Sequence, residues 1–192
     1  NILPKLGPLD MDKLPLFSSS QNWHIKDPER FQELIDEIKT LVAPGHYLGD
    51  NLFCWSRNLS LFTDDKFRVA WEKNITNIAD EAIAWRRYIL ACAAYHCVQL
   101  EGDFVECGAY NGSGVKIVMD YLGGISFPRK FWAYDTFDEH PVPGHQMPEN
   151  NEKLFERVRN RFFGYDQVSL IKGLIPDSFD VGLPEKITYL HI

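Results

Sequence analysis

The sequence contains no apolar run near the roughly 20 residues that a membrane-spanning helix needs. Its first residues also lack the charged and then apolar pattern of a secretory signal peptide. Positive charge is scarce, because the formal net charge is −7 and the pI is about 5.3. Binding to the phosphates of a nucleic acid normally needs a basic face on the protein. We therefore expect a soluble, cytoplasmic protein with no membrane or nucleic-acid partner, and a small molecule suits it better as a ligand.

Cysteine is rare, and its spacing follows no known pattern. The four cysteines include no C-x-x-C pair and no disulfide-framework spacing: Cys54, Cys92, Cys97 and Cys107. Free, buried thiols in a reducing compartment are the simplest interpretation. Internal repeats are absent too. With 192 residues and 45% hydrophobic content, the chain is long enough for one well-buried core and not obviously for two.

The sequence pattern changes near residue 100. Residues 1–26 carry several prolines, have no sustained period and are predicted to form an arm or a lid. Residues 27–101 are predicted to form a helical flank because apolar residues there recur at helical spacing. The predicted helices begin at Asp27-Pro28, which provides a cap and a proline at the first position, at Asp64-Asp65, and at about Ala79, the last of them running to Leu100.

From residue 102 onward, short apolar strands alternate with helices. This alternation implies an α/β fold with parallel strands, in which ligands gather at the carboxyl ends of the strands. We expect helices on both faces of this sheet. The predicted strands are Phe104–Glu106, Phe131–Tyr134, Val168–Ile171 and Ile187–Ile192, and the predicted helices are Val115–Leu122 and about Glu152–Phe163.

A glycine-rich turn follows the first of these strands. The strand ends at Glu106, and Gly108, Gly112 and Gly114 come before or within the start of the next helix. Glycines allow the backbone to approach a ligand closely, and the amides at a helix start attract negative charge. The spacing differs from the dinucleotide pattern G-x-G-x-x-G, because the acid comes first. An acid followed by glycines is the order expected of an S-adenosylmethionine site.

The second strand also ends in an acid. Asp135 follows Glu106 by some thirty residues, at a position where one carboxylate can accept hydrogen bonds from both hydroxyls of a ribose. Thr136 and Phe137 then begin a loop whose aromatic and apolar parts are suited to covering an adenine. The alternative is an ordinary polar turn at the end of a strand.

Four segments in this order resemble the TylF/MycF-type (macrocin O-methyltransferase-like) class I O-methyltransferases of macrolide sugars. The resemblance covers about Leu100–Ile192. Its segments are Gly102-Asp-Phe-Val-Glu106-Cys-Gly108, then Asp135-Thr136-Phe137 with Pro141, then Gly173-Leu-Ile-Pro-Asp177-Ser178-Phe179, and last Ile187-Thr-Tyr-Leu-His191-Ile192.

The resemblance implies a mostly parallel, Rossmann-like class I methyltransferase sheet. It implies S-adenosyl-L-methionine as the cofactor and a hydroxyl of a small molecule, such as a sugar or another secondary metabolite, as the methyl acceptor. The residues that it places around the cofactor are Glu106, Gly108, Tyr110, Gly112 and Ser113 near the methionine part, Asp135 at the ribose, and Lys172 and Gly173 beside the adenine. Ala109, Thr136 and Phe137 complete the predicted cofactor-binding set.

The sequence departs from the family at two places in this half. The family usually has Gly-Gly-Ser after the first glycine, whereas this chain has Gly112-Ser113-Gly114, so the hydroxyl is displaced by one residue. The family usually has a glycine and a leucine before the loop proline, where this chain has Glu139 and His140. If that glycine has a positive φ, Glu139 cannot copy it cheaply, and the loop must differ.

The fourth strand bears on the chemistry. In the family it leads into an Asp-x-Asp-x-Tyr segment whose acids bind a divalent metal such as Mg²⁺ and orient the acceptor hydroxyl. This sequence ends one residue before that position, so we expect the metal ligands, the general base and further strands just after Ile192, in a longer natural chain. Within residues 1–192, His191 is the candidate catalytic residue, although a buried histidine with a backbone partner explains it at least as well.

Three other interpretations remain open. His140 and His145 flank a proline-rich segment near Asp135, Asp138 and Glu139, and this cluster could ligate a metal, although loop histidines are usually solvated. A NAD(P)-dependent oxidoreductase would share the strand, glycine turn and second acid. A non-catalytic cofactor-binding or assembly protein would also retain these contacts. The N-terminal arm leaves room for a homo-oligomer.

Overall fold

The computed structural model describes residues 22–42, 46–55, 60–140, 142, 144, 147 and 149–192. The predicted arm therefore lies mostly outside the described residues, as do Pro141 and His145. The chain divides into two compact units between Tyr88 and Ile89, inside helix α5 (Ala84–Cys97). Each unit is described by itself.

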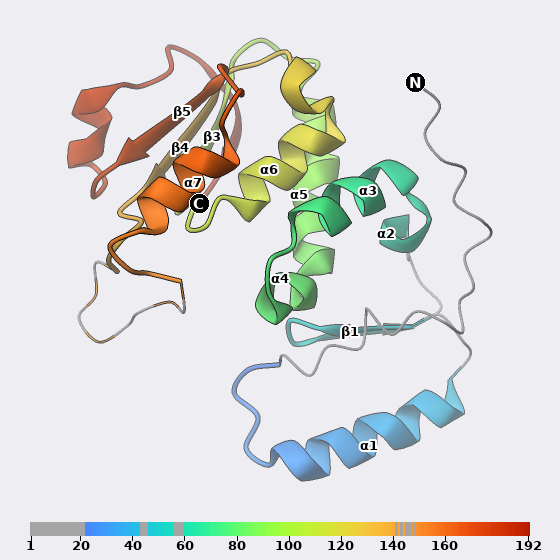
Figure 1. Ribbon diagram of the computed structural model, residues 1–192. Helices are drawn as coiled ribbons and strands as arrows, with labels where there is room; N and C mark the ends of the chain where they lie inside the picture. The colour runs from blue at the N-terminus through green and yellow to red at the C-terminus, as the bar shows by residue number, and fades with distance from the viewer. Residues whose placement is uncertain are drawn as a thin grey trace. The chain divides into compact units, whose positions relative to one another are not determined.

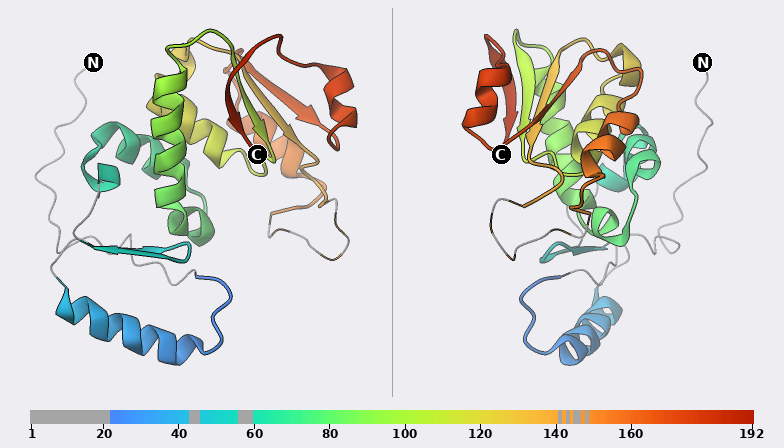
Figure 2. Two further views of the ribbon diagram at one scale, coloured as in Figure 1. Left: turned by 180° about the vertical axis from the view of Figure 1, so that it is seen from behind. Right: turned by 60° about the vertical axis from the view of Figure 1, so that its left-hand side comes forward.

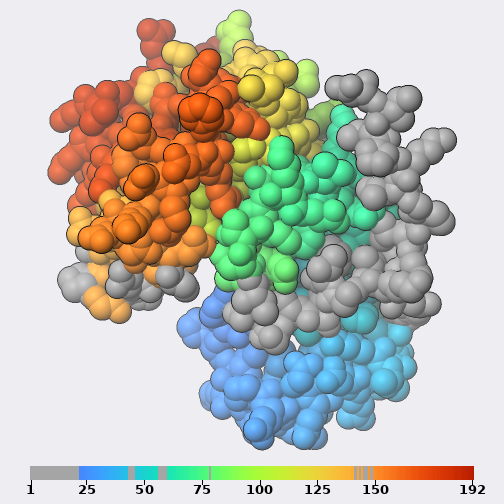
Figure 3. Space-filling view, in the orientation of Figure 1, coloured from blue at the N-terminus to red at the C-terminus, as the bar shows by residue number. Residues whose placement is uncertain are grey.

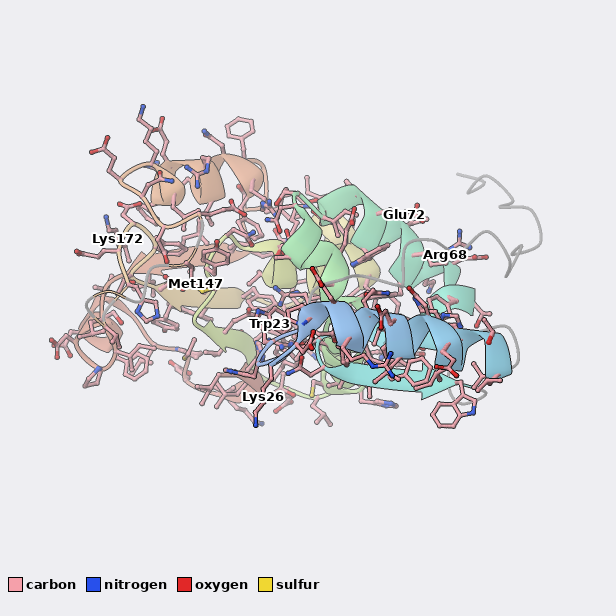
Figure 4. The ribbon with its side chains drawn as sticks, turned by 90° about the horizontal axis from the view of Figure 1, so that it is seen from below. Trp23, Lys26, Arg68, Glu72, Met147 and Lys172 are labelled. Carbon is pink, nitrogen blue, oxygen red and sulfur yellow. The ribbon has the colours of Figure 1, made fainter. Side chains whose placement is uncertain are left out.

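The first unit combines helices with a short hairpin (Figure 1). Helix α1 (Pro28–Leu41) begins as predicted, with the Asp27 carboxylate accepting a hydrogen bond from the Arg30 amide at 3.0 Å. The remaining elements are β1 (His46–Gly49), β2 (Leu52–Trp55), α2 (Ser60–Thr63), α3 (Asp65–Asn74), α4 (Ile78–Ala82) and the first part of α5. Arg68 and Glu72, labelled in Figure 4, lie one turn apart on α3 with 3.9 Å between Nη2 and Oε1.

The hairpin was not predicted from the sequence. Strands β1 and β2 pair antiparallel, and Gly49 is opposite Leu52 across a two-residue turn. Asp50 and Asn51 in that turn have φ values of 53° and 59°, which suits a type I′ turn and the tolerance of these residues for left-handed backbone. The Asp50 carboxylate also accepts a hydrogen bond from Arg86 Nε at 2.9 Å, which ties the turn to α5.

The predicted helix from Ala79 to Leu100 is wrong in one respect, because it is interrupted at Ile83. There the backbone leaves helical geometry, with φ −102° and ψ 23°. The buried Tyr47 hydroxyl lies at this break and donates a hydrogen bond to the Ala82 carbonyl at 2.8 Å. This bond satisfies a carbonyl that a continuous helix would have satisfied itself.

The second unit is an α/β layer structure built on a four-stranded, all-parallel sheet. The four strands predicted from the sequence are all present, within one or two residues of the predicted ends: β3 (Asp103–Cys107), β4 (Phe131–Asp135), β5 (Val168–Lys172) and β6 (Ile187–His191). They are arranged in the order β5-β4-β3-β6. Because β4 and β5 extend the sheet on one side of β3 and β6 on the other, the order of strands reverses beside β3. This arrangement is compatible with a Rossmann-like fold.

Most of the core lies on one face of this sheet. Helices α5, α6 (Ser113–Tyr121) and α7 (Leu154–Arg161) supply Ala94, Val118 and Val158 to a cluster with sheet residues such as Phe104 and Phe131. The opposite face packs Val105, Tyr134 and Ile171 against Phe179 of the 3₁₀ helix η4 (Asp177–Val181). The right-hand view of Figure 2 shows α7 and η4 on opposite sides of the sheet.

Helices on both faces were expected. Among the described residues, the three α-helices of this unit cover one face, and the second face carries a 3₁₀ helix instead. A further 3₁₀ helix, η3 (Gly124–Ser126), follows α6. Helix α7 lies at the surface in Figure 3, in keeping with its charged outer side and its two buried residues, Leu154 and Val158.

Candidate functional site at the carboxyl edge of the sheet

Three turns meet where parallel strands β3, β4 and β5 end. The turn after β3 is joined to β4 by the Gly108 amide, which donates to the Tyr134 carbonyl at 2.8 Å. The turn after β5 is joined to β4 by the Gly173 amide, which donates to the Asp135 carbonyl at 3.0 Å. Figure 4 looks onto this edge of the sheet and labels Met147 and Lys172 there. The sequence placed its main polar segments at these strand ends, and the structure brings them together.

The glycines of the first turn have different surroundings. Gly108 has a φ of 92°, and no atom lies within 4 Å of the position that a Cβ would take, so its backbone is open to an approaching molecule. Gly112 has a φ of 75°, but its Cβ would lie 2.9 Å from Phe162 Cε2. Gly108 therefore leaves space on the site, whereas Gly112 permits close packing of α6 against α7.

Asp135 ties the glycine turn to the loop after β4. Its Oδ2 accepts a hydrogen bond from the Tyr110 amide at 2.7 Å, and its Oδ1 accepts one from the Phe137 amide at 2.5 Å. A carboxylate has about four acceptor positions, so each oxygen keeps one for a ligand. Asp135 thus has a structural role, and it retains the capacity expected for binding a ribose.

A cleft of about 400 Å³ lies between these turns. Its size falls in the usual range for small-molecule sites. Five of the predicted cofactor residues line it: Gly108, Tyr110, Asp135, Thr136 and Gly173. Seven further residues complete its walls: Tyr134, Glu139, His140, Met147, Asn150, Leu174 and Ile175.

The other predicted cofactor residues do not line this cleft. Ala109, Ser113 and Gly112 are buried. Phe137 is also fully buried, with its ring 5.0 Å from that of Phe155. Its φ of 58° turns the chain so that the side chain enters the core. Lys172 forms an ion pair with Asp138 instead, and this hydrogen bond lowers the pKa of the Asp138 carboxyl.

One wall of the cleft was missed in the sequence. The Asn150 side chain donates a hydrogen bond to the Phe137 carbonyl at 2.6 Å and accepts one from the Met147 amide at 3.0 Å. The Tyr110 hydroxyl accepts a hydrogen bond from the Glu149 amide at 2.8 Å, which connects this segment to the glycine turn. Two of these contacts join distant residues, Asn150 to Phe137 over 13 positions and Glu149 to Tyr110 over 39, so no local pattern predicts them. The sequence signal that could have revealed this wall is the set of polar residues just before helix α7.

Glu106 and His191 form a separate pair at the ends of β3 and β6. They are register partners on adjacent parallel strands, so their side chains lie on the same face. The distance from His191 Nδ1 to Glu106 Oε1 is 3.5 Å. The Glu106 side chain is only 3% exposed, and its Oε2 has no hydrogen-bond partner among the described residues. An unsatisfied buried polar atom of this kind costs about 1–3 kcal/mol.

The neighbouring thiol is affected by the same surroundings. Burial raises the pKa of Cys107, and the negative charge of Glu106 raises it further. The Cys107 side chain is therefore a protonated thiol rather than a nucleophile near neutral pH. All four cysteines are free, as the sequence analysis predicted, but each is only partly buried, so the expectation of buried thiols is wrong.

Metal and membrane features were searched among the described residues. Within them, no three His, Cys, Asp or Glu side chains come together in a way that could hold a metal ion. His140 lines the cleft, and its proposed partner His145 falls outside that part of the chain. None of the helices that the structure describes has the length and apolar character to cross a bilayer.

Comparison with known proteins adds no relative. No protein-family model matches the sequence, and a search of curated proteins finds no match either.

Proposed function

We propose that this chain is a class I S-adenosylmethionine-dependent O-methyltransferase that acts on a hydroxyl of a small molecule. One observation carries the proposal: the glycine turn after a buried acidic strand, and the acid that ends the next strand, form two walls of one cleft. The order of strands reverses beside β3, which is where open α/β sheets bind ligands.

The cleft suits the nucleoside part of this cofactor. Gly108 leaves its backbone open, and Asp135 keeps acceptor positions for ribose hydroxyls. Met147, Leu174 and Ile175 provide an apolar surface suited to a purine ring. The residues at the site therefore fit the group.

The bound cofactor would supply a methyl group on a sulfonium sulfur, and the protein would hold the acceptor oxygen in line with it. The residues lining the cleft would bind the cofactor and orient it. The described residues contain no acidic cluster suited to Mg²⁺, so no step of the proposal depends on a metal. Acceptor activation by Mg²⁺ remains a separate expectation from the family resemblance.

The test is calorimetric titration with S-adenosylhomocysteine beside NADH. We expect micromolar binding of S-adenosylhomocysteine and none of NADH. Binding of NADH alone would assign the chain to the oxidoreductases, which share this geometry. If neither ligand binds, the glycine turn is structural and the proposal fails.

Replacement of Asp135 sharpens this test. Asp135→Ala should weaken S-adenosylhomocysteine binding by about 1–3 kcal/mol, the usual loss for hydrogen bonds to a charged group. Asp138→Ala is the matched control, because Asp138 lies in the same loop and pairs with Lys172 outside the cleft. If the Asp135→Ala and unaltered proteins bind S-adenosylhomocysteine with equal affinity, Asp135 does not bind the cofactor.

A binding result would then be extended to catalysis. Methyl transfer from labelled S-adenosylmethionine should be screened over sugars and other hydroxylated small molecules, with and without magnesium. Cofactor binding without transfer to any of them would favour a non-catalytic binding protein.

A further inference from the structure

The pair formed by Glu106 and His191 is not explained by the cleft. Neither residue lines it, and the pair lies at the ends of β3 and β6, on the other side of β3 from the strands β4 and β5 that complete the cleft. His191 Nδ1 and Glu106 Oε2 are both buried without a hydrogen-bond partner among the described residues. Two buried polar groups this close, both without a hydrogen-bond partner, call for an explanation.

The geometry favours one tautomer of His191. A donor and a carboxylate oxygen normally lie 2.7–3.2 Å apart, so a shift of a few tenths of an ångström turns the 3.5 Å contact into a hydrogen bond from Nδ1–H to Glu106 Oε1. In neutral imidazole only one nitrogen carries hydrogen. If Nδ1 donates to Glu106, Nε2 holds a lone pair and accepts hydrogen bonds.

The other ring nitrogen is open to an incoming group. The His191 side chain is 29% exposed, whereas its Nδ1 is buried. No hydrogen bond from a described residue reaches His191 Nε2, and Nε2 is not one of the buried polar atoms that lack a partner, so it belongs to the exposed part of the ring. The ring therefore has one nitrogen facing a buried acid and one accessible nitrogen at the carboxyl edge.

We propose that Glu106 is a positioning residue that holds His191 as the Nδ1–H tautomer, so that His191 Nε2 accepts a hydrogen bond from the hydroxyl to be methylated. The role of Nε2 rests on the proposed function, whereas the tautomer does not. The place of the pair agrees with this role: the nucleoside would fill the cleft over β3, β4 and β5, and the acceptor would approach over β3 and β6.

His140 provides an internal control for the tautomer. Its Nδ1 accepts a hydrogen bond from the Val142 amide at 3.1 Å, which leaves the hydrogen on Nε2. The two histidines should therefore be opposite tautomers. Long-range ¹H–¹⁵N correlation spectra at pH 8, where ordinary imidazole is neutral, distinguish the two forms directly.

The expected spectrum shows His191 as Nδ1–H and His140 as Nε2–H. Glu106→Leu should shift His191 toward Nε2–H and leave His140 unchanged. An Nε2–H tautomer of His191 in the unaltered protein would overturn the inference. This measurement needs no ligand, and it also stands if the Glu106→Leu variant fails to fold.

The contact with a hydroxyl is tested with a probe. Methyl α-glucoside, added to protein saturated with S-adenosylhomocysteine, should shift the His191 Nε2 resonance in a saturable way. His191→Gln places an amide near the position of Nε2 and should retain probe affinity within about threefold, whereas His191→Phe should lose about tenfold or more. S-adenosylhomocysteine binding should stay within about threefold in both variants.

The outcomes separate the two proposals. If S-adenosylhomocysteine does not bind the unaltered protein, the proposed function fails and the tautomer result still decides the role of Glu106. If it binds and the probe leaves the Nε2 resonance unmoved, the hydroxyl contact of His191 is wrong while the cofactor site stands.

Discussion

At the scale of single residues, Gly112 shows why a glycine in a cofactor-like turn is not always a ligand contact. Gly112→Ala should lower the free energy of unfolding by about 2 kcal/mol or more. Its left-handed φ of 75° disfavours alanine, and the new Cβ would lie 2.9 Å from Phe162 Cε2. Urea unfolding followed by circular dichroism measures the change.

Gly164→Ala is the matched control for this substitution. Gly164 has a similar φ of 82°, and no atom lies within 4 Å of its Cβ position. It should therefore cost only the backbone strain, about 1 kcal/mol. Equal losses for the two variants would mean that the contact with Phe162 relaxes freely.

The carboxyl of Asp138 should make stability depend on pH. Its pKa is lowered chiefly by the hydrogen bond from Lys172, and the amide of Phe155 lowers it further. A pKa lower in the folded than in the unfolded state stabilises the protein above the unfolded value of about 3.9, and this stabilisation disappears as pH falls through the folded value. Asp138→Asn should therefore destabilise the protein at pH 7 and much less near pH 3. Urea midpoints at both pH values test this, and an equal loss at both would contradict it.

At the scale of elements, α6 contains a buried charged group in an otherwise apolar helix. Lys116 Nζ lies 2.9 Å from Asp120 Oδ1 and 2.6 Å from the Tyr165 hydroxyl, and both charged side chains are less than one tenth exposed. Asp120→Leu should destabilise the protein by about 3–5 kcal/mol, because it leaves the Lys116 charge buried without its counter-ion. Equilibrium unfolding measures this loss.

The replacement of the whole group is the informative comparison. The triple variant Lys116→Met, Asp120→Leu, Tyr165→Phe removes both charges and the hydroxyl together, so the Lys116 charge is not left without its counter-ion. It should be more stable than Asp120→Leu alone. A triple variant less stable than the single one would show that the ion pair makes a large net contribution.

The elements also show how far the sequence predicts the fold. The four parallel strands were predicted because each is a short apolar run next to a turn residue, and Asp27 marks the start of α1 by its capping chemistry. The hairpin β1–β2 was missed, although Asp50-Asn51 between two aromatic runs was its signal. The break at Ile83 was missed because it depends on Tyr47, 36 positions away, which no local pattern shows.

The candidate site was predictable to a similar extent. Gly108 follows β3 and Asp135 ends β4, and parallel strands bring their carboxyl ends together, so their meeting in one cleft followed from the order of elements. Phe137 was expected near the cofactor and lies in the core, because a positive φ directs it there. Asn150 was missed because its place at the cleft depends on a hydrogen bond to the Phe137 carbonyl, 13 positions away.

At the scale of the whole molecule, the sheet of the second unit has an open edge at β5. Among the described residues, β5 pairs only with β4. The Gly173 amide donates to the Asp135 carbonyl, so the two-residue period of a strand turns the Ile171 amide toward β4 and the Leu170 amide outward. An edge of this kind is a surface on which another strand can pair.

Amide hydrogen exchange measures the protection of each backbone amide along this edge. In dilute solution, the Leu170 amide should exchange at least tenfold faster than that of Ile171, because only the latter must break a ladder hydrogen bond. Amides of β4, which has partners on both sides, should be protected throughout. If Leu170 becomes protected as the protein concentration rises, a second copy covers β5 and a homo-oligomer forms through this edge. If Leu170 exchanges as slowly as Ile171 at every concentration, its amide has a partner within the chain, and the edge is not open.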